Sequence, residues 1–247
     1  MKNSPFFCRG THANMLTLII VSVIVSAALI VGAVWGVYGK LPKQVEGFII
    51  ALAGGALIAS VMSELVTPSI EEAGLLWAVL GVGIGAAVFT GVDYLIDEKW
   101  NSSSGGGLLA AISLDGIPEN LALGVALIGA GPKEVAALAG SILLSNLPEA
   151  AGGAKQMRDG DMSKKKILLL WSATAGILSV AAIGGNLLLE GAPDEALGVI
   201  RCIAAGAVVA SLATEVFPQA FREDHHMTGI AVSLGLILSV LLSSLSG

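Results

Sequence analysis

The chain alternates between eight long apolar runs and short polar segments. Each run is about 20 residues long, which is the length that an α-helix needs to cross about 30 Å of hydrocarbon. The runs cover approximately residues 15–38, 47–69, 75–96, 107–130, 134–155, 167–189, 196–220 and 227–246. This pattern predicts an all-α integral membrane protein with eight transmembrane helices.

The run at 15–38 is predicted to be the first transmembrane helix rather than a cleaved signal peptide. No Asp, Glu, Lys or Arg occurs between Arg9 and Lys40, so the apolar stretch is too long and too uniform for a signal sequence. Residues 1–14 are therefore expected to form a polar N-terminal segment, and residues 15–247 a single transmembrane domain. The fourth and fifth runs contain carboxylates and prolines, so six or seven crossings remain the alternative.

Composition agrees with a membrane location. Hydrophobic residues make up 55% of the chain, charged residues 13%, and the mean hydropathy is +0.84, all outside the range of soluble domains. Glycines lie inside the apolar runs beside alanine and serine, where small residues allow membrane helices to pack closely. Nothing in the charge distribution supports nucleic-acid binding. Cys8 and Cys202 form neither a disulfide framework nor a CxxC metal motif.

The distribution of lysine and arginine predicts the orientation in the membrane. With eight crossings both termini lie on one side, and each basic residue can be assigned to a side. The side of the termini receives Lys2, Arg9, Lys133 and Arg201, and the other side receives Lys40, Lys43, Lys99, Lys155, Arg158, Lys164, Lys165, Lys166 and Arg222. Because cytoplasmic loops carry the excess of basic residues, we expect a multi-pass protein of the cell (inner) membrane with both termini outside.

An internal repeat relates the second run to the seventh. Residues 53–65 align without gaps to residues 204–216, and both segments contain the pattern Ser-x-x-x-Glu. The predicted topology sends these two helices through the bilayer in opposite directions. Helices 1–3 and 6–8 are therefore expected to form inverted repeats, as found in secondary transporters, with two central helices between them in a 3+2+3 arrangement.

The two central runs share a second pattern, with Pro-Glu in the middle of an apolar segment. It occurs at residues 114–120 and again at residues 144–150, and it places Glu119 and Glu149 well inside the membrane region. A carboxylate at that depth is unfavourable by a few kcal/mol unless it faces a polar cavity or a cation. Two such carboxylates suggest one common reason, although a polar clasp between the two helices is the alternative.

Helical spacing brings further oxygen ligands to the same two acids. Asp115 lies four residues before Glu119, and Ser145 lies four residues before Glu149, so each pair falls on one helix face. Asn146 can join the second face. Each proline also deprives the carbonyl oxygen four residues earlier of its helical hydrogen bond. Carboxylate, amide, hydroxyl and carbonyl oxygens together predict a site for a hard or borderline metal cation.

Two weaker candidate ligands come from the repeat. Glu64 and Glu215 end the two Ser-x-x-x-Glu patterns, and the predicted spans place them nearer to helix ends than the central acids. A role at a gate of the metal path competes there with an interfacial position in which the side chain reaches water.

These motifs resemble the ZIP family of divalent-metal transporters. That family has eight helices, outward termini and His-Asn-x-Pro-Glu-Gly-like motifs on helices 4 and 5. Position by position, the motif residues of this chain are Asp115, Gly116, Pro118 and Glu119 on helix 4, and Ser145, Asn146, Pro148 and Glu149 on helix 5. Residues 211–218 are similar to an acidic, proline-containing segment of helix 7. The resemblance implies a transporter domain whose substrate is a divalent metal ion, with no resident cofactor.

The departures from the family motif affect the metal that is expected. Asp115 and Ser145 stand where the family has its two histidines, and the segment 101–107 contains no histidine. Imidazole suits zinc, whereas all-oxygen sites favour manganese, iron(II) or magnesium. Zinc, manganese, iron and cadmium therefore all remain alternatives for the transported ion. The number of metal sites, one or two, is also left open by the sequence.

Other classes of function receive less support. Asp115 and Glu119 share one helix, so they do not form the facing acid pair of an intramembrane hydrolase, and no HExxH motif or nucleophile elbow occurs. The chain is therefore not expected to be an enzyme. A non-metal solute permease or a membrane scaffold, in which the buried acids are structural, is the main alternative. The oligomeric state is open, with a homodimer as one alternative.

Overall fold

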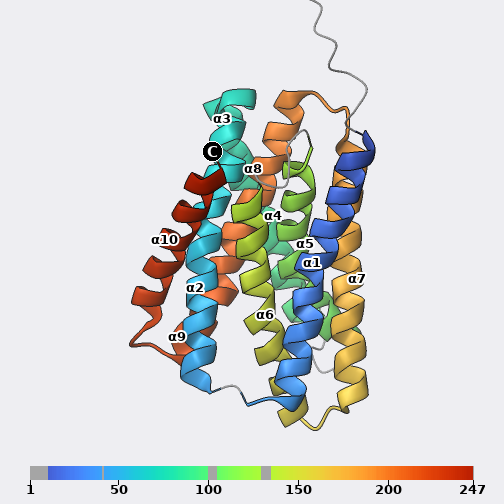
Figure 1. The fold of residues 1–247 in the computed structure, drawn as a ribbon, viewed down its shortest axis with the longest axis vertical. Coiled ribbons are helices and arrows are strands. Elements are labelled where there is room, and N and C mark those ends of the chain that lie inside the picture. Colours follow the sequence, from blue (N-terminus) through green and yellow to red (C-terminus); the bar gives the residue numbers. More distant parts are fainter. Residues whose placement is uncertain (1–10, 41, 100–104, 129–134, 247) are drawn as a thin grey trace, which may run out of the picture.

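The computed structural model describes residues 11–40, 42–99, 105–128 and 135–246, and the secondary structure of these residues is entirely helical (Figure 1). The all-α prediction is therefore confirmed. The elements are α1 (Thr11–Tyr38), α2 (Lys43–Val61), the π-helical η1 (Met62–Val66), α3 (Thr67–Ala73), α4 (Leu75–Lys99), α5 (Gly105–Ala126), α6 (Ala136–Asp159), α7 (Lys164–Leu189), α8 (Asp194–Ser211), the π-helical η2 (Leu212–Val216), α9 (Phe217–Glu223) and α10 (Thr228–Ser246).

Several of these elements are continuous, so each predicted apolar run corresponds to one helical rod. The elements α2, η1 and α3 follow one another without a break, as do α8, η2 and α9. Five rods of the described chain are long and apolar enough to cross a membrane: Met15–Tyr38, Lys43–Ala73, Leu75–Ile96, Lys164–Leu189 and Asp194–Glu223. The helix α10 holds a shorter apolar stretch, Thr228–Ser244. These helices are compatible with the predicted membrane location.

Local sequence explains where the rods begin and end. Pro42 and Pro193 stand just before α2 and α8, where the missing proline N–H is of no consequence for the helix. Gly74 ends α3 with a φ of 85°, a left-handed conformation that favours glycine, and so turns the chain directly into α4. Ser163 caps α7 by accepting a hydrogen bond from the backbone N–H of Lys166 at 3.4 Å.

The rods form two packed groups. The first helix group consists of α1, α5, α6 and α7, in which α1 packs against α6 and α7, and α5 packs against α7. The second helix group consists of α2, α4, α8 and α10 with their extensions α3 and α9, in which α2 packs against α10 and α4 against α8. The groups meet where α2 contacts α6 and where α5 contacts α8. We call the end that holds the connections α1–α2, α6–α7 and α9–α10 the lower end (Figure 1).

Glycines allow the closest helix contacts, and these contacts occur in matched pairs. A Cβ on Gly55 would overlap the carbonyl oxygen of Val232, and a Cβ on Gly206 would overlap that of Val82. Gly55 and Gly206 occupy the same position in the repeated segments 53–65 and 204–216. A second matched pair is Gly235 against Leu52 and Gly85 against Ile203. The packing of α2 on α10 is thus repeated in the packing of α8 on α4.

We expect Gly85→Ala to destabilise the fold by about 1–3 kcal/mol, because the added methyl group meets a backbone oxygen that cannot move without its helix. Gly83→Ala, two residues away on the same helix, is the control, since a Cβ there meets nothing within 4 Å. Thermal unfolding in detergent measures both. Equal stability of the two variants would contradict the close packing of α4 on α8.

Candidate functional site

The two Pro-Glu motifs lie inside continuous helices. Pro118 is an internal residue of α5, and Pro148 is an internal residue of α6. Each helix continues past its proline, so the peptide carbonyl four residues earlier loses its usual helical donor. These carbonyls belong to Leu114 and Leu144, beside the predicted ligands. At both motifs, a carbonyl oxygen without its helical hydrogen bond therefore lies beside the polar side chains of the predicted ligands.

On α5, the structure buries the predicted acid and a neighbour that sequence reasoning missed. Glu119 is 5% exposed, and Asn120 is completely buried. The Asn120 amide donates a hydrogen bond from Nδ2 to the carbonyl oxygen of Gly116 at 2.9 Å, while its Oδ1 has no hydrogen-bond partner. An amide oxygen buried without a donor is a ready acceptor for a cation. The position of Asn120 directly after Glu119, within an apolar run, was the sequence signal that could have identified it as a ligand.

On α6, the predicted ligands are buried to different degrees. Ser145 is 4% exposed, Asn146 is 1% exposed and Glu149 is half-buried. Nδ2 of Asn146 donates to the carbonyl oxygen of Val25 in α1 at 3.1 Å, a bond that ties α6 to α1. Because the amide nitrogen is engaged there, the ligand that Asn146 offers is Oδ1.

Asp115 is the predicted ligand about which least can be said. Its backbone belongs to α5, four residues before Glu119, but its side chain lies outside the described part of the structure. Among the described side chains, no three His, Cys, Asp or Glu residues come together as a metal-binding group. A metal held here would therefore depend on two carboxylates with amide, hydroxyl and carbonyl oxygens.

The structure places the two weaker candidates in π-helical segments rather than near helix ends. Glu64 lies in η1 and Glu215 in η2, and both rods continue beyond them, to Ala73 and Glu223. A proline follows each segment, and the backbone N–H groups of the residues ending them bond five positions back, Thr67 to Met62 and Phe217 to Leu212. Sequence reasoning did not anticipate these π turns, although a proline soon after each acid was the signal.

The surroundings of the two acids differ. The carboxylate of Glu64 is half-buried and accepts hydrogen bonds from Ser63 at 3.1 Å and from Ser243 of α10 at 3.2 Å. Glu215 is exposed on η2. The sequence repeat is therefore kept in the backbone at these positions, but the environment of the acid is not the same.

A cluster of buried hydroxyl groups joins three helices near the site. Ser60 Oγ of α2 lies 2.8 Å from Ser141 Oγ of α6 and 2.7 Å from Ser239 Oγ of α10. The Ser141 hydroxyl donates to the carbonyl oxygen of Ala137 at 2.8 Å. Since each hydroxyl has one proton, the bonds then run from Ser239 to Ser60 to Ser141 to the Ala137 carbonyl. This cluster crosses the boundary between the two helix groups.

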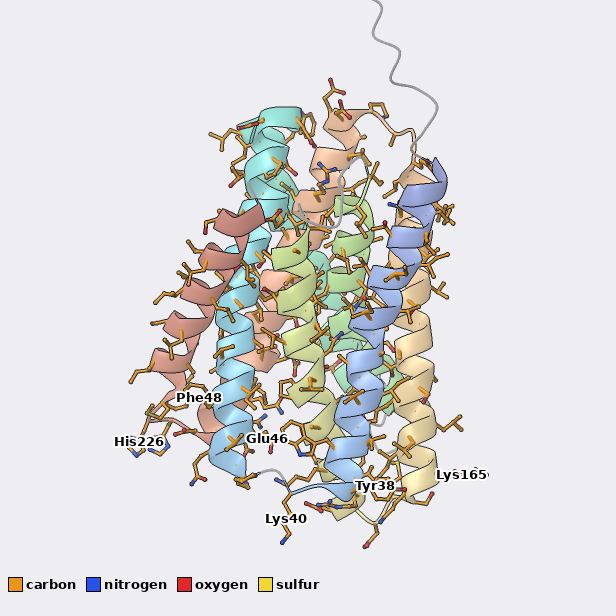
Figure 2. All side chains as sticks on the ribbon, in the orientation of Figure 1. Tyr38, Lys40, Glu46, Phe48, Lys165 and His226 are labelled. Atoms are coloured by element: carbon orange, nitrogen blue, oxygen red, sulfur yellow. The ribbon has the colours of Figure 1, made fainter. Side chains whose placement is uncertain are left out.

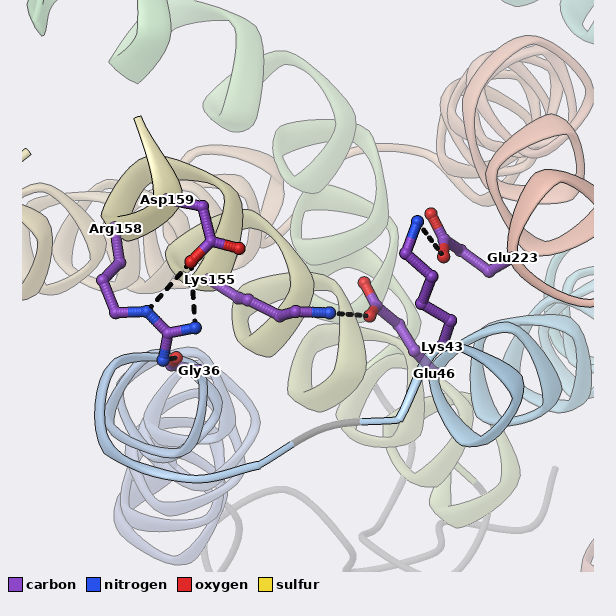
Figure 3. Close-up of polar contacts among 7 residues, drawn as sticks. All are labelled: Gly36, Lys43, Glu46, Lys155, Arg158, Asp159 and Glu223. Atoms are coloured by element: carbon purple, nitrogen blue, oxygen red, sulfur yellow. Dashed lines mark hydrogen bonds and ion pairs between the residues drawn. The ribbon is translucent and has the colours of Figure 1, made fainter. Parts of the chain in front are cut away.

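Charged side chains form ion pairs at the lower end (Figure 3). Lys155 Nζ of α6 lies 3.4 Å from Glu46 Oε2 of α2, and Lys43 Nζ lies 3.5 Å from Glu223 Oε2. Arg158 pairs with Asp159 at 3.0 Å and also donates to the carbonyl oxygen of Gly36 at 2.9 Å.

The opposite end and the histidines complete the inventory of charged groups. Arg201 of α8, which is 8% exposed, pairs with Glu72 of α3 at 2.7 Å. His225 and His226 are exposed at the α9–α10 connection, with ring centroids 3.9 Å apart. Neither histidine lies in α5 or α6. This pair therefore does not stand in for the two histidines that the ZIP motif has at the positions of Asp115 and Ser145.

Comparisons with known proteins do not assign this chain to a family. No protein-family model matches the chain, and no curated protein matches it.

Removal of one hydroxyl group tests the serine cluster. Ser239→Ala should destabilise the fold by about 1 kcal/mol, because Ser60 loses a donor that nothing else replaces in an apolar interior. Ser233→Ala on the same helix is the control, since its hydroxyl bonds only to the Gly229 carbonyl of its own helix at 2.9 Å and is exposed. Reversible unfolding in mixed micelles measures both, and an equal effect would remove the cluster from the account.

Proposed function

We propose that this protein transports a divalent metal cation across the membrane, through a site formed by oxygen ligands of α5 and α6. The observation that carries the proposal is that the buried Glu119 and the half-buried Glu149 lie inside helices that have no basic residue near their Pro-Glu motifs. The helix α5 contains no lysine or arginine, and the basic residues of α6 lie at its lower end. A carboxylate inside an apolar helix bundle attracts a cation strongly, because the low dielectric screens its charge little.

The ligand set supports a hard or borderline metal. Glu119 and Glu149 offer carboxylates, Asn120 and Asn146 offer amide oxygens, and Ser145 offers a hydroxyl. Oxygen donors of this kind favour manganese and iron(II), whereas zinc prefers imidazole and thiolate. The side chain of Asp115, one turn before Glu119, would add a third carboxylate and raise the affinity for a divalent ion. Zinc and cadmium remain in the panel because of the resemblance to the ZIP family.

The packing of the rods supports an inverted-repeat transporter with eight crossings. Each contact between α2 and α10 described above has a counterpart between α8 and α4, and the π turns η1 and η2 lie within one residue of each other in the alignment of the repeats. In transporters with inverted repeats, the substrate site lies between the repeats, near the middle of the membrane. The helices α5 and α6, which carry the candidate ligands, connect the two repeats in the chain.

The charge distribution supports an orientation with the lower end in the cytoplasm. Figure 2 places Lys40 and Lys165 at this end. The other basic side chains of the described lower end are Lys43, Lys155, Arg158, Lys164, Lys166 and Arg222. Arg201, in contrast, lies near the start of α8 at the opposite end. By the positive-inside rule both termini then face outward.

Charge removal at the site is the direct test of transport. In proteoliposomes, uptake of manganese, iron(II), zinc, cadmium and cobalt is compared for the native protein and for Glu119→Gln and Glu149→Gln. Glutamine keeps the size but removes one negative charge from a low-dielectric site, so we expect uptake to fall by about tenfold or more.

The matched control is Glu98→Gln, which neutralises a carboxylate that accepts a hydrogen bond from Tyr94 at 2.6 Å on the exposed side of α4. This variant should transport at the native rate. Native rates for Glu119→Gln and Glu149→Gln would make the buried acids structural. A protein that carries none of the five metals would favour a non-metal permease or a scaffold.

The topology has its own test. Single cysteines at Gly160, in the α6–α7 connection, and at Gly247 should react with an impermeant reagent from opposite sides of the membrane, the first from the cytoplasm. Labelling of both from the same side would contradict the eight crossings and, with them, the inverted repeat.

A further inference from the structure

Two polar contacts join the helix groups along α2 and α6. One is the bond between Ser60 and Ser141, and the other is the ion pair between Glu46 and Lys155. They are separated by four turns on both helices, about 21 Å at the usual rise per residue. Ser145 and Glu149, two of the candidate metal ligands, lie on α6 between these contacts. The ion pair is therefore on the lower side of the candidate site.

The Glu46 carboxylate is held tightly between the two groups. Its side chain is 7% exposed, and a Cβ on Gly152 of α6 would overlap its Oε1. The amide of Gln219, on α9, lies against the same point. Glycine at position 152 is thus needed for the Glu46 carboxylate to fit between α2 and α6. Such a carboxylate needs a positive partner, and Lys155 provides it.

Other ion pairs of the structure have a different setting. Lys43, at the start of α2, pairs with Glu223 of α9 within the second helix group, and its side chain is 72% exposed. Arg201 and Glu72 also belong to that group. The pair Glu46–Lys155, by contrast, opposes separation of the two groups, and its Lys155 side chain is 23% exposed (Figure 3).

The opposite junction, between α5 and α8, does not repeat this ion pair. In the alignment of the two halves, Leu197 of α8 corresponds to Glu46, and Val125 of α5 corresponds to Lys155. Both are buried apolar residues. The α2–α6 junction therefore has a charged contact where the corresponding positions of the α5–α8 junction hold apolar residues.

We propose that Lys155 is a gating residue: its ammonium group, held by Glu46, closes the lower end of the path from the candidate site and must leave Glu46 before a cation passes. This inference rests on the proposed function. A positive charge at this point repels an arriving divalent cation. The lysine stem is long and its side chain is partly exposed, so the ammonium group can move outward, and the freed Glu46 carboxylate then faces the cation.

A reporter for opening is available on α2. Ala53 is completely buried and lies on the same helix face as Glu46 and Ser60, between the two polar contacts. The rate of maleimide labelling of Ala53→Cys, in a Cys8→Ser and Cys202→Ala background, measures how often the junction opens. In Lys155→Met we expect this rate to rise by about tenfold, equivalent to about 1.4 kcal/mol. Lys155→Arg keeps the charge and should keep the slow rate.

The matched control is Lys43→Met, which removes an exposed ion pair of the same helix and should leave the labelling rate unchanged. If Lys155→Met does not fold, Glu46→Gln combined with Lys155→Met removes both charges and carries the same expectation. Equal rates in the native and the charge-free proteins would overturn the inference.

The labelling requires no metal, so it separates the two claims. Faster labelling in a protein that transports none of the metals would leave the closure standing and refute the proposed function. Metal uptake with unchanged labelling would do the reverse.

Discussion

Polar groups inside a membrane bundle depend on partners within the protein, because hydrocarbon offers none. Most of the buried polar groups described here meet this demand locally or across one helix contact. The Ser239, Ser60 and Ser141 hydroxyls bond in series, and Asn146 donates to a carbonyl of α1. Several buried polar atoms of the described residues have no hydrogen-bond partner, among them the hydroxyls of Ser22, Ser26 and Ser113 and the amide oxygen of Asn120. Of these atoms, the Asn120 oxygen directly follows Glu119 in α5, where we propose that the metal binds.

Close backbone contact keeps that region in place. Where Gly55, Gly85, Gly206 and Gly235 face carbonyl oxygens, α2 packs on α10 and α4 packs on α8 with no side chain between the backbones. The first helix group is then attached to this packed unit along α2 and α5. Polar contacts between Ser60 and Ser141 and between Glu46 and Lys155 fall on the α2 side of that attachment. The boundary between the two helix groups thus has polar contacts on its α2 side, whereas Leu197 and Val125 on its α5 side are buried apolar residues.

The sequence predicted the helices well because their signal is local. Each predicted apolar run lies mostly on one helical rod of the described chain, and Glu119 is as buried as an internal Pro-Glu pattern suggests. The π turns were missed, since the register change depends on how Pro68 and Pro218 affect the preceding turn. The pairing of Glu46 with Lys155 was also missed, because it depends on which faces of α2 and α6 meet. The pairing of Asp115 with Glu119 stays a prediction, as does the preference for one metal.

Locating the ion is the most direct test of a cation site between α5 and α6. Crystals of the native protein grown with manganese, with diffraction recorded at the manganese absorption edge, would place the metal by its anomalous signal. The account predicts a peak bounded by the oxygens of Glu119 and Glu149, about 2.1–2.3 Å from its oxygen ligands. A peak at Glu64, Glu215 or the His225–His226 pair, with none between α5 and α6, would contradict it.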